Sequence, residues 1–176
     1  KQRYKAEVIP DINEDILREA YEVERSSFPE QMQLDEEELK GVLENKDGVH
    51  LSIKDEKGKV LGNILSLRQS QEYNDIKDLD SDFTNDEDAL YIESFAIKPE
   101  SRSLEVFNNL FKTLKNEARK RNYKKITMHA RVSTGFSSVL QKRYGAKFFR
   151  RIENWNDFGE PFDYLEIEMP EDDIEK

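Results

Sequence analysis

Hydrophobic and polar positions follow two periods along this chain, and the changes between them predict its elements. Apolar residues spaced three and four apart predict helices at about 13–28, 34–47, 103–121 and 134–144. Alternating or continuous apolar runs between turn residues predict strands at 3–9, 49–54, 60–68, 90–97, 126–132, 146–152 and 162–169. The expected order is β-α-α-β-β-β-α-β-α-β-β, a mixed α/β (α+β) sheet protein.

The stretch 72–88 interrupts this pattern, because it is acidic and contains a single lysine. Its polarity predicts an exposed loop inserted before the strand at 90–97. No linker or internal repeat divides the rest, so we expect one domain over 1–170 and an acidic tail over 171–176.

Charge changes this picture, because the two signs are segregated along the sequence. The net charge is −10, yet basic residues gather within 91–151 and acidic residues flank that block on both sides. Such a division favours a polyanionic ligand at the block and a cationic partner elsewhere. The alternative is a solvated surface whose charges complement helix dipoles.

Composition excludes several kinds of chemistry. The chain has no cysteine, so disulfides, thiolate metal sites and a cysteine nucleophile are ruled out. It contains no signal peptide and no apolar run near 18 residues, which predicts a soluble cytoplasmic protein without a membrane segment.

Three local sequences, taken in order, carry a family resemblance. The first is Glu24 followed by Phe28-Pro29, the second is Tyr-Ile-Glu-Ser-Phe-Ala-Ile-Lys-Pro-Glu-Ser-Arg at 91–102, and the third is Leu-Gln-Lys-Arg-Tyr-Gly-Ala-Lys-Phe at 140–148. Together with the element order they resemble the GNAT (GCN5-related N-acetyltransferase) superfamily. The resemblance implies the GNAT fold and an acyl-CoA substrate, with acetyl-CoA as the expected acyl donor.

In that family a glycine-containing loop at the start of the central helix binds the CoA pyrophosphate through backbone N–H groups. The matching stretch here keeps Arg102, but Glu105 and Phe107 stand where the family has small residues. By resemblance, the acyl-CoA site comprises Phe95, Ile97, Arg102, Ser103, Leu104, Glu105, Val106 and Phe107.

The resemblance also assigns two catalytic candidates and no metal. Glu93 matches a general base that takes a proton from the attacking amine, and its alternative role is an ion pair on a strand. The family's tyrosine acid falls at Gln141 here, so Tyr144 is the substitute candidate, with core packing as its alternative.

Two further residue groups are weighed and set aside. His129 lies on a predicted strand, where we expect a structural role. Asp78, Asp80 and Asp82 have calcium-loop spacing, but Phe83 and Ala89 occupy the positions of the required glycine and glutamate. The loop is expected either to recruit a cationic acceptor or to be plain solvated chain.

Two functions therefore remain open. The first is an N-acyltransferase that acetylates a primary amine of a cationic small molecule or of a lysine side chain by direct attack. The second is a GNAT-fold interaction module that binds no CoA and has lost catalysis. The expected partners are an acyl-CoA and a cationic amine. A homodimer is an open alternative, and nucleic acid is disfavoured because few aromatics accompany the basic residues.

Overall fold

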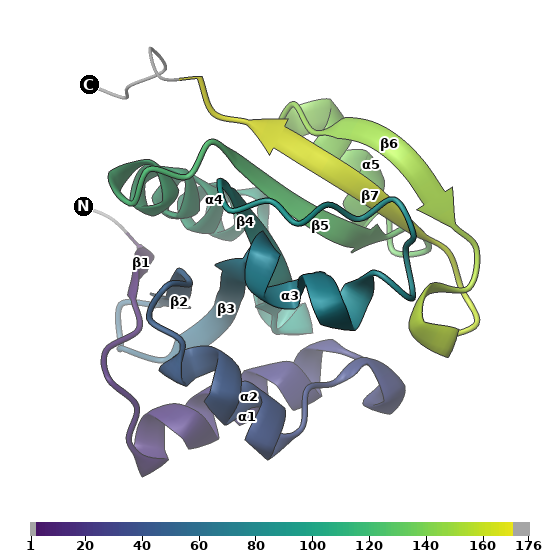
Figure 1. Ribbon diagram of the computed structural model, residues 1–176. Coiled ribbons are helices and arrows are strands. Elements are labelled where there is room, and N and C mark those ends of the chain that lie inside the picture. Colours follow the sequence, from purple (N-terminus) through teal and green to yellow (C-terminus); the bar gives the residue numbers. More distant parts are fainter. Residues whose placement is uncertain (1–2, 171–176) are drawn as a thin grey trace. The chain divides into compact units, whose positions relative to one another are not determined.

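The computed structural model describes residues 3–170, which form two compact units (Figure 1). The first unit comprises the chain up to Leu67 together with Glu93–Glu117. The second comprises Arg68–Ile92 together with the chain from Ala118 onward. Strand β4 (Ala89–Ile97) gives its beginning to the second unit and its end to the first.

The first unit places two helices beside three antiparallel strands. Its elements are β1 (Lys5–Val8), α1 (Glu14–Ser27), η1 (Glu30–Met32), α2 (Glu36–Glu44), β2 (His50–Lys54), β3 (Val60–Arg68), the end of β4, η2 (Pro99–Ser101) and the larger part of α4 (Leu104–Lys120). β1 pairs with β2 and β2 pairs with β3, both antiparallel.

Side chains fix where both N-terminal helices begin. The Asn13 side chain accepts a hydrogen bond from the Ile16 amide at the start of α1. At α2, Asp35 and Glu38 form a reciprocal capping box. The apolar faces of the two helices then meet in a core that contains Ala20 and Leu39. Burying these faces supplies most of the helices' stability.

The second unit contains a sheet with its own aromatic core. Its elements are α3 (Gln69–Ile76), the start of β4, β5 (Lys125–Arg131), α5 (Phe136–Arg143), β6 (Lys147–Ile152), η3 (Trp155–Asp157) and β7 (Phe162–Glu168). Its core joins Ile76, Phe83, Tyr91, Trp155 and Tyr164.

The hydrogen-bonded strand order is β1-β2-β3-β4-β5-β7-β6, a seven-stranded mixed sheet. The parallel pairing of β4 with β5 joins Ala89–Tyr91 to Lys125–Thr127. β7 then pairs antiparallel with both β5 and β6. The predicted mixed α/β architecture and its element order are thereby confirmed, with one helix added.

That added helix corrects the prediction for the acidic stretch 72–88. The stretch is not a plain exposed loop, because α3 occupies its beginning and Asp80 and Phe83 are buried. Ring contacts and ion pairs hold these two residues. The many acidic residues of this stretch led to the prediction that it is exposed. The buried side chains of Asp80 and Phe83 nevertheless pack it against the rest of the unit.

Candidate active site

Glu93 lies on the half-buried face of the end of β4. Along this strand Glu93 and Phe95 are half-buried, while Ser94 and Ala96, which alternate with them, are buried. Alternate residues of a strand face opposite sides, so Glu93 and Phe95 share one face. The Oε2 atom of Glu93 is itself buried. This is the position of a carboxylate that can take up a proton beside apolar surface.

The opposite face of β4 is tied to α1 by a buried carboxylate. Glu24 accepts hydrogen bonds from the Ser94 hydroxyl at 2.9 Å and from the Leu34 amide at 3.2 Å. Burial raises the pKa of Glu24 despite these two hydrogen bonds, and nearby Glu38 raises it further. Glu24, which the resemblance used only as a motif residue, thus holds α1 against the strand that carries Glu93.

The start of α4 keeps part of an anion-binding geometry. Ser103 precedes the helix, and its hydroxyl accepts a hydrogen bond from the Val106 amide at 3.2 Å. Its carbonyl accepts one from the Phe107 amide at 3.0 Å. Among the described residues, the amides of Leu104 and Glu105 have no hydrogen-bond acceptor. Two backbone donors therefore remain for a phosphate, and Glu105 brings a negative charge to the same helical turn.

The Arg102 guanidinium is already hydrogen-bonded to the backbone of the first unit. Its Nε donates to the Ile97 carbonyl at 3.0 Å, and one of its terminal nitrogens donates to the Ser27 carbonyl at 3.1 Å. The guanidinium thus connects the end of β4 to the end of α1. Arg102 consequently holds the loop before α4 in place, a role that the resemblance did not include.

Phe107 fills the space that a glycine would leave open. Its ring stacks on Phe95, with ring centroids 4.8 Å apart and planes inclined by 20°. The stacked pair covers the β4 face that carries Glu93. The predicted residues at 95–107 are therefore brought together within the first unit. Their backbone donors fit a phosphate group, whereas Glu105 and Phe107 restrict its approach.

Tyr144 lies in the second unit, at the end of α5. It is half-buried, and burial raises the pKa of its hydroxyl, partly opposed by Arg143. The hydroxyl is therefore protonated at neutral pH. Gln141, one turn earlier, donates to Ser137, and Ser137 donates to Asp163 at 2.6 Å. Gln141 thus belongs to a hydrogen-bonded chain inside this unit.

His129 is the centre of a buried network that sequence reasoning treated only as structural. Its Nε2 lies 2.9 Å from Asp80, and its Nδ1 lies 2.8 Å from the Tyr91 hydroxyl. Since a carboxylate only accepts, Nε2 carries the proton and Nδ1 accepts from Tyr91. The His129 ring stacks on Trp155 at 3.8 Å. Burial lowers the pKa of His129, although Asp80 opposes that shift.

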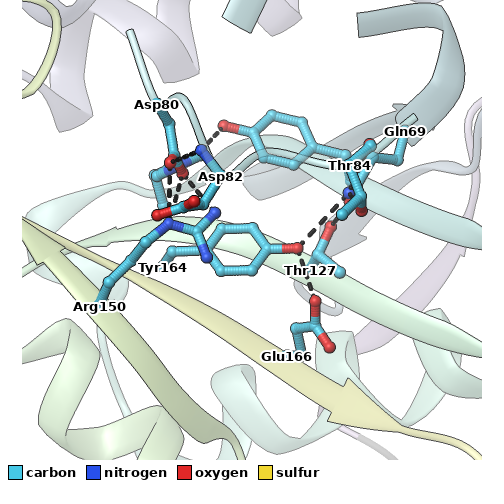
Figure 2. A network of polar contacts seen from close by, with 10 residues as sticks. Gln69, Asp80, Asp82, Thr84, Thr127, Arg150, Tyr164 and Glu166 are labelled. Carbon is cyan, nitrogen blue, oxygen red and sulfur yellow. Dashed lines mark hydrogen bonds and ion pairs between the residues drawn. The ribbon is translucent and has the colours of Figure 1, made fainter. Parts of the chain in front are cut away.

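Asp80 also receives a bidentate ion pair from Arg150, with distances of 2.6–3.0 Å (Figure 2). Burial alone raises the pKa of Asp80, but the hydrogen bonds from His129 and Arg150 outweigh it and lower the pKa to about 2. The Arg150 guanidinium lies over the Tyr164 ring at 4.1 Å. One aspartate of the acidic stretch is thus held by two basic partners.

A second network of hydrogen bonds includes the Tyr164 hydroxyl (Figure 2). This hydroxyl donates to Glu166 at 2.8 Å, and Gln69 donates to Thr84 at 3.0 Å. Thr127 donates to Gln69 in turn. Burial and the Glu166 carboxylate raise the pKa of Tyr164. Thr127 and Glu166 are single polar residues within apolar strands, and this is the sequence signal for part of the network.

No group of three or more potential ligand side chains is placed to hold a metal ion within residues 3–170. In the same part of the chain, no helix is long and apolar enough to cross a membrane.

No protein-family profile matches the sequence, and no curated protein is significantly similar to it. Solved structures, however, match along nearly the whole chain. The ribosomal-protein-S18-alanine N-acetyltransferase from Escherichia coli is 13% identical with a TM-score of 0.71, and the match covers 98% of this chain and 99% of that one.

Ard1 from Thermoplasma volcanium is 12% identical with a TM-score of 0.75, and the match covers 96% of this chain and 99% of that one. An aminoglycoside 6'-N-acetyltransferase complexed with coenzyme A is 12% identical with a TM-score of 0.71, covering 94% and 97%. At such identities the similarity establishes the fold, and this chain has the fold of these enzymes.

Proposed function

We propose that this chain, whose fold is that of the GNAT superfamily, is an N-acyltransferase that uses acetyl-CoA as its acyl donor. The observation that carries the proposal is that Glu93 on β4 and the start of α4 follow each other closely in the chain. A half-buried carboxylate on β4 is followed by a helix start with two unused backbone donors. The first suits proton removal, and the second suits binding of a phosphate.

The proposed reaction needs a base beside the attacking nitrogen. Glu93 takes a proton from the acceptor ammonium, and the free amine attacks the thioester carbonyl carbon. The C–N bond forms, the C–S bond breaks, and the CoA thiolate leaves with the electron pair of that bond. The thiolate takes up a proton from solvent, and Tyr144, which is protonated at neutral pH, stays the candidate acid that the family resemblance assigns.

The proposed acceptor is a primary amine on a cationic molecule, either a small molecule or a lysine side chain. The support is electrostatic, since the acidic residues on both sides of the basic block give this protein its net charge of −10. A negative surface raises the local concentration of a cationic substrate.

The decisive experiment is calorimetric titration of acetyl-CoA into the protein, with desulfo-CoA in a parallel titration. We expect binding in the micromolar range, because the Leu104 and Glu105 amides remain available. A screen of primary amines in a thiol-release assay should then show turnover that Glu93→Gln lowers by about 100-fold. No binding of either ligand, with no thermal shift, would overturn the proposal.

A second function has one specific observation in its favour. The Phe107–Phe95 stack and the two hydrogen bonds of Arg102 are contacts within the protein, made by residues that the resemblance assigns to ligand binding. A GNAT-fold interaction module without CoA would need such packing. The same titration separates the two functions, since only the enzyme binds both CoA compounds.

A further inference from the structure

Strand β6 is the outer edge of the sheet in the second unit, beside β7 (Figure 1). Within residues 3–170 its strand partner is β7, so its other side keeps backbone donors and acceptors directed outward. The pairing shifts register between Phe148 and Arg150, which leaves Phe149 as an extra residue in the strand.

This edge carries two of the most exposed large apolar side chains of the described chain. Phe148 is 45% exposed and Phe149 is 44% exposed. The Phe149 ring already receives the Lys147 ammonium at 5.4 Å from its centroid. Consecutive exposed aromatic residues on a sheet edge favour addition of another strand.

The charges along the edge are arranged by end. The exposed cation Lys147 begins the strand, and the exposed Lys142 and Arg143 precede it in sequence at the end of α5. The exposed anion Glu153 directly follows the strand, and the exposed Asp157 comes after it in η3.

The two arginines between these ends add little net charge to the edge. Arg150 is paired with Asp80, and Arg151 is paired with Asp163 at 2.8 Å. The edge is therefore basic at one end, apolar in the middle and acidic at the other end.

We propose that β6 pairs antiparallel with β6 of a second copy of this chain. A two-fold axis at Arg150 places Lys147 of each copy opposite Glu153 of the other, and Phe148 and Phe149 line the shared edge on either side of the axis. A peptide of a single charge sign would match one end and be repelled at the other. The charge pattern therefore favours a second copy over an acidic or a basic partner.

The test is sedimentation velocity of the intact protein between about 1 and 100 μM. A dimer whose dissociation constant lies in this range changes from mostly monomer to mostly dimer across it. The wild type should shift from monomer to dimer across that range. Lys147→Glu and Glu153→Lys should each weaken association by about tenfold, because each puts like charges together at both ends of the interface. The double variant should regain most of the lost affinity.

Two control variants keep this result interpretable. Phe148→Ser should abolish the dimer, while its circular dichroism and melting temperature stay near those of the wild type, because the side chain is exposed. Lys57→Glu, in the β2–β3 turn, makes the same charge change and should leave association unaltered. A wild type that stays monomeric at the highest concentration, or a double variant as weak as the single ones, would overturn the proposal.

Discussion

Phe107 lies nearly parallel to Phe95, at 4.8 Å between ring centroids. The contact joins the first turn of α4 to the β4 face that also carries Glu93. A side chain at position 107 therefore contributes to local packing and at the same time limits access to the backbone of the helix start.

Glu105→Gly should strengthen CoA binding. Glu105 lies in the first turn of α4, whose amides would receive a pyrophosphate, and its carboxylate lies 3.9 Å from the exposed Arg3. Removing one negative charge from such a position is worth about 1 kcal/mol, or about fivefold in Kd at low salt. Calorimetry with CoA measures the change.

The matched control is Glu14→Gly, which also removes an acidic residue from a first helical turn. It should leave CoA affinity unchanged. Equal affinities for Glu105→Gly and the wild type would mean that the phosphates bind elsewhere.

Glu93→Gln should lower kcat by about 100-fold, since a positioned general base contributes roughly that factor or more. The amide keeps the size of the carboxylate but cannot take up a proton. The CoA Kd should stay the same, which separates a loss of chemistry from a loss of binding. Steady-state kinetics with the best amine from the screen gives both quantities. Glu100→Gln, on the exposed turn η2, serves as the control and should keep full activity.

Acid should destabilise the second unit in two pH windows. The pKa of His129 is lowered by burial, so the unfolded chain takes up a proton first as the pH falls below about 6.5. The pKa of Asp80 is lowered to about 2, so its contribution to stability is lost between about pH 4 and pH 2. In both windows the free energy of unfolding should fall with decreasing pH.

Urea denaturation at a series of pH values measures these slopes. His129→Gln should remove the slope near pH 6 and keep the slope below pH 4. An unchanged slope near pH 6 in this variant would show that another group titrates there.

Asp80→Asn should cost about 3 kcal/mol of unfolding free energy, because it removes the negative charge that Arg150 pairs with and leaves one acceptor oxygen for both Arg150 and His129. Arg150→Met, which keeps an apolar chain over the Tyr164 ring, should cost less. The double variant should cost less than the two single changes together, since both act on one ion pair. Strict additivity in urea denaturation would argue against a direct coupling.

Glu24→Gln should be neutral or slightly stabilising at pH 7. The raised pKa of Glu24 means that its ionised form is disfavoured in the folded state, so folding is favoured below the unfolded pKa and loses that benefit as the pH rises. The glutamine oxygen can still accept from Leu34, and its amide can donate to Ser94. Glu24→Leu loses both bonds and should destabilise by about 2 kcal/mol. Thermal melts at pH 5 and pH 8 compare the three proteins.

Much of this fold could be predicted from periodicity, because its helices and strands bury one face each. α4 and β4 were placed to within a residue, since Leu110, Phe111 and Leu114 mark a helical stripe and 90–97 is a continuous apolar run. The helix α3 was missed, because the Gln- and Glu-rich sequence at its start has little apolar periodicity.

The sequence predicted where the residues of the candidate site lie along the chain, but not which residues they contact. The sequence motif locates Glu93 and the start of α4, whereas it cannot reveal that Arg102 bonds to Ser27 and Ile97. Such contacts depend on segments that are far apart in the sequence. For the same reason the link between Asp80 and Arg150, 70 residues apart, had no local signal.

The ion pair of Asp80 with Arg150 has a consequence for how this protein can diverge. The acidic stretch cannot be exchanged for that of a related protein by itself, because its aspartate satisfies His129 and Arg150 on two different strands. A graft without that carboxylate would leave the half-buried Arg150 guanidinium unneutralised. The three residues are thus expected to change together across descendants of this sequence, as one inherited unit, while the solvated acidic positions around them vary independently.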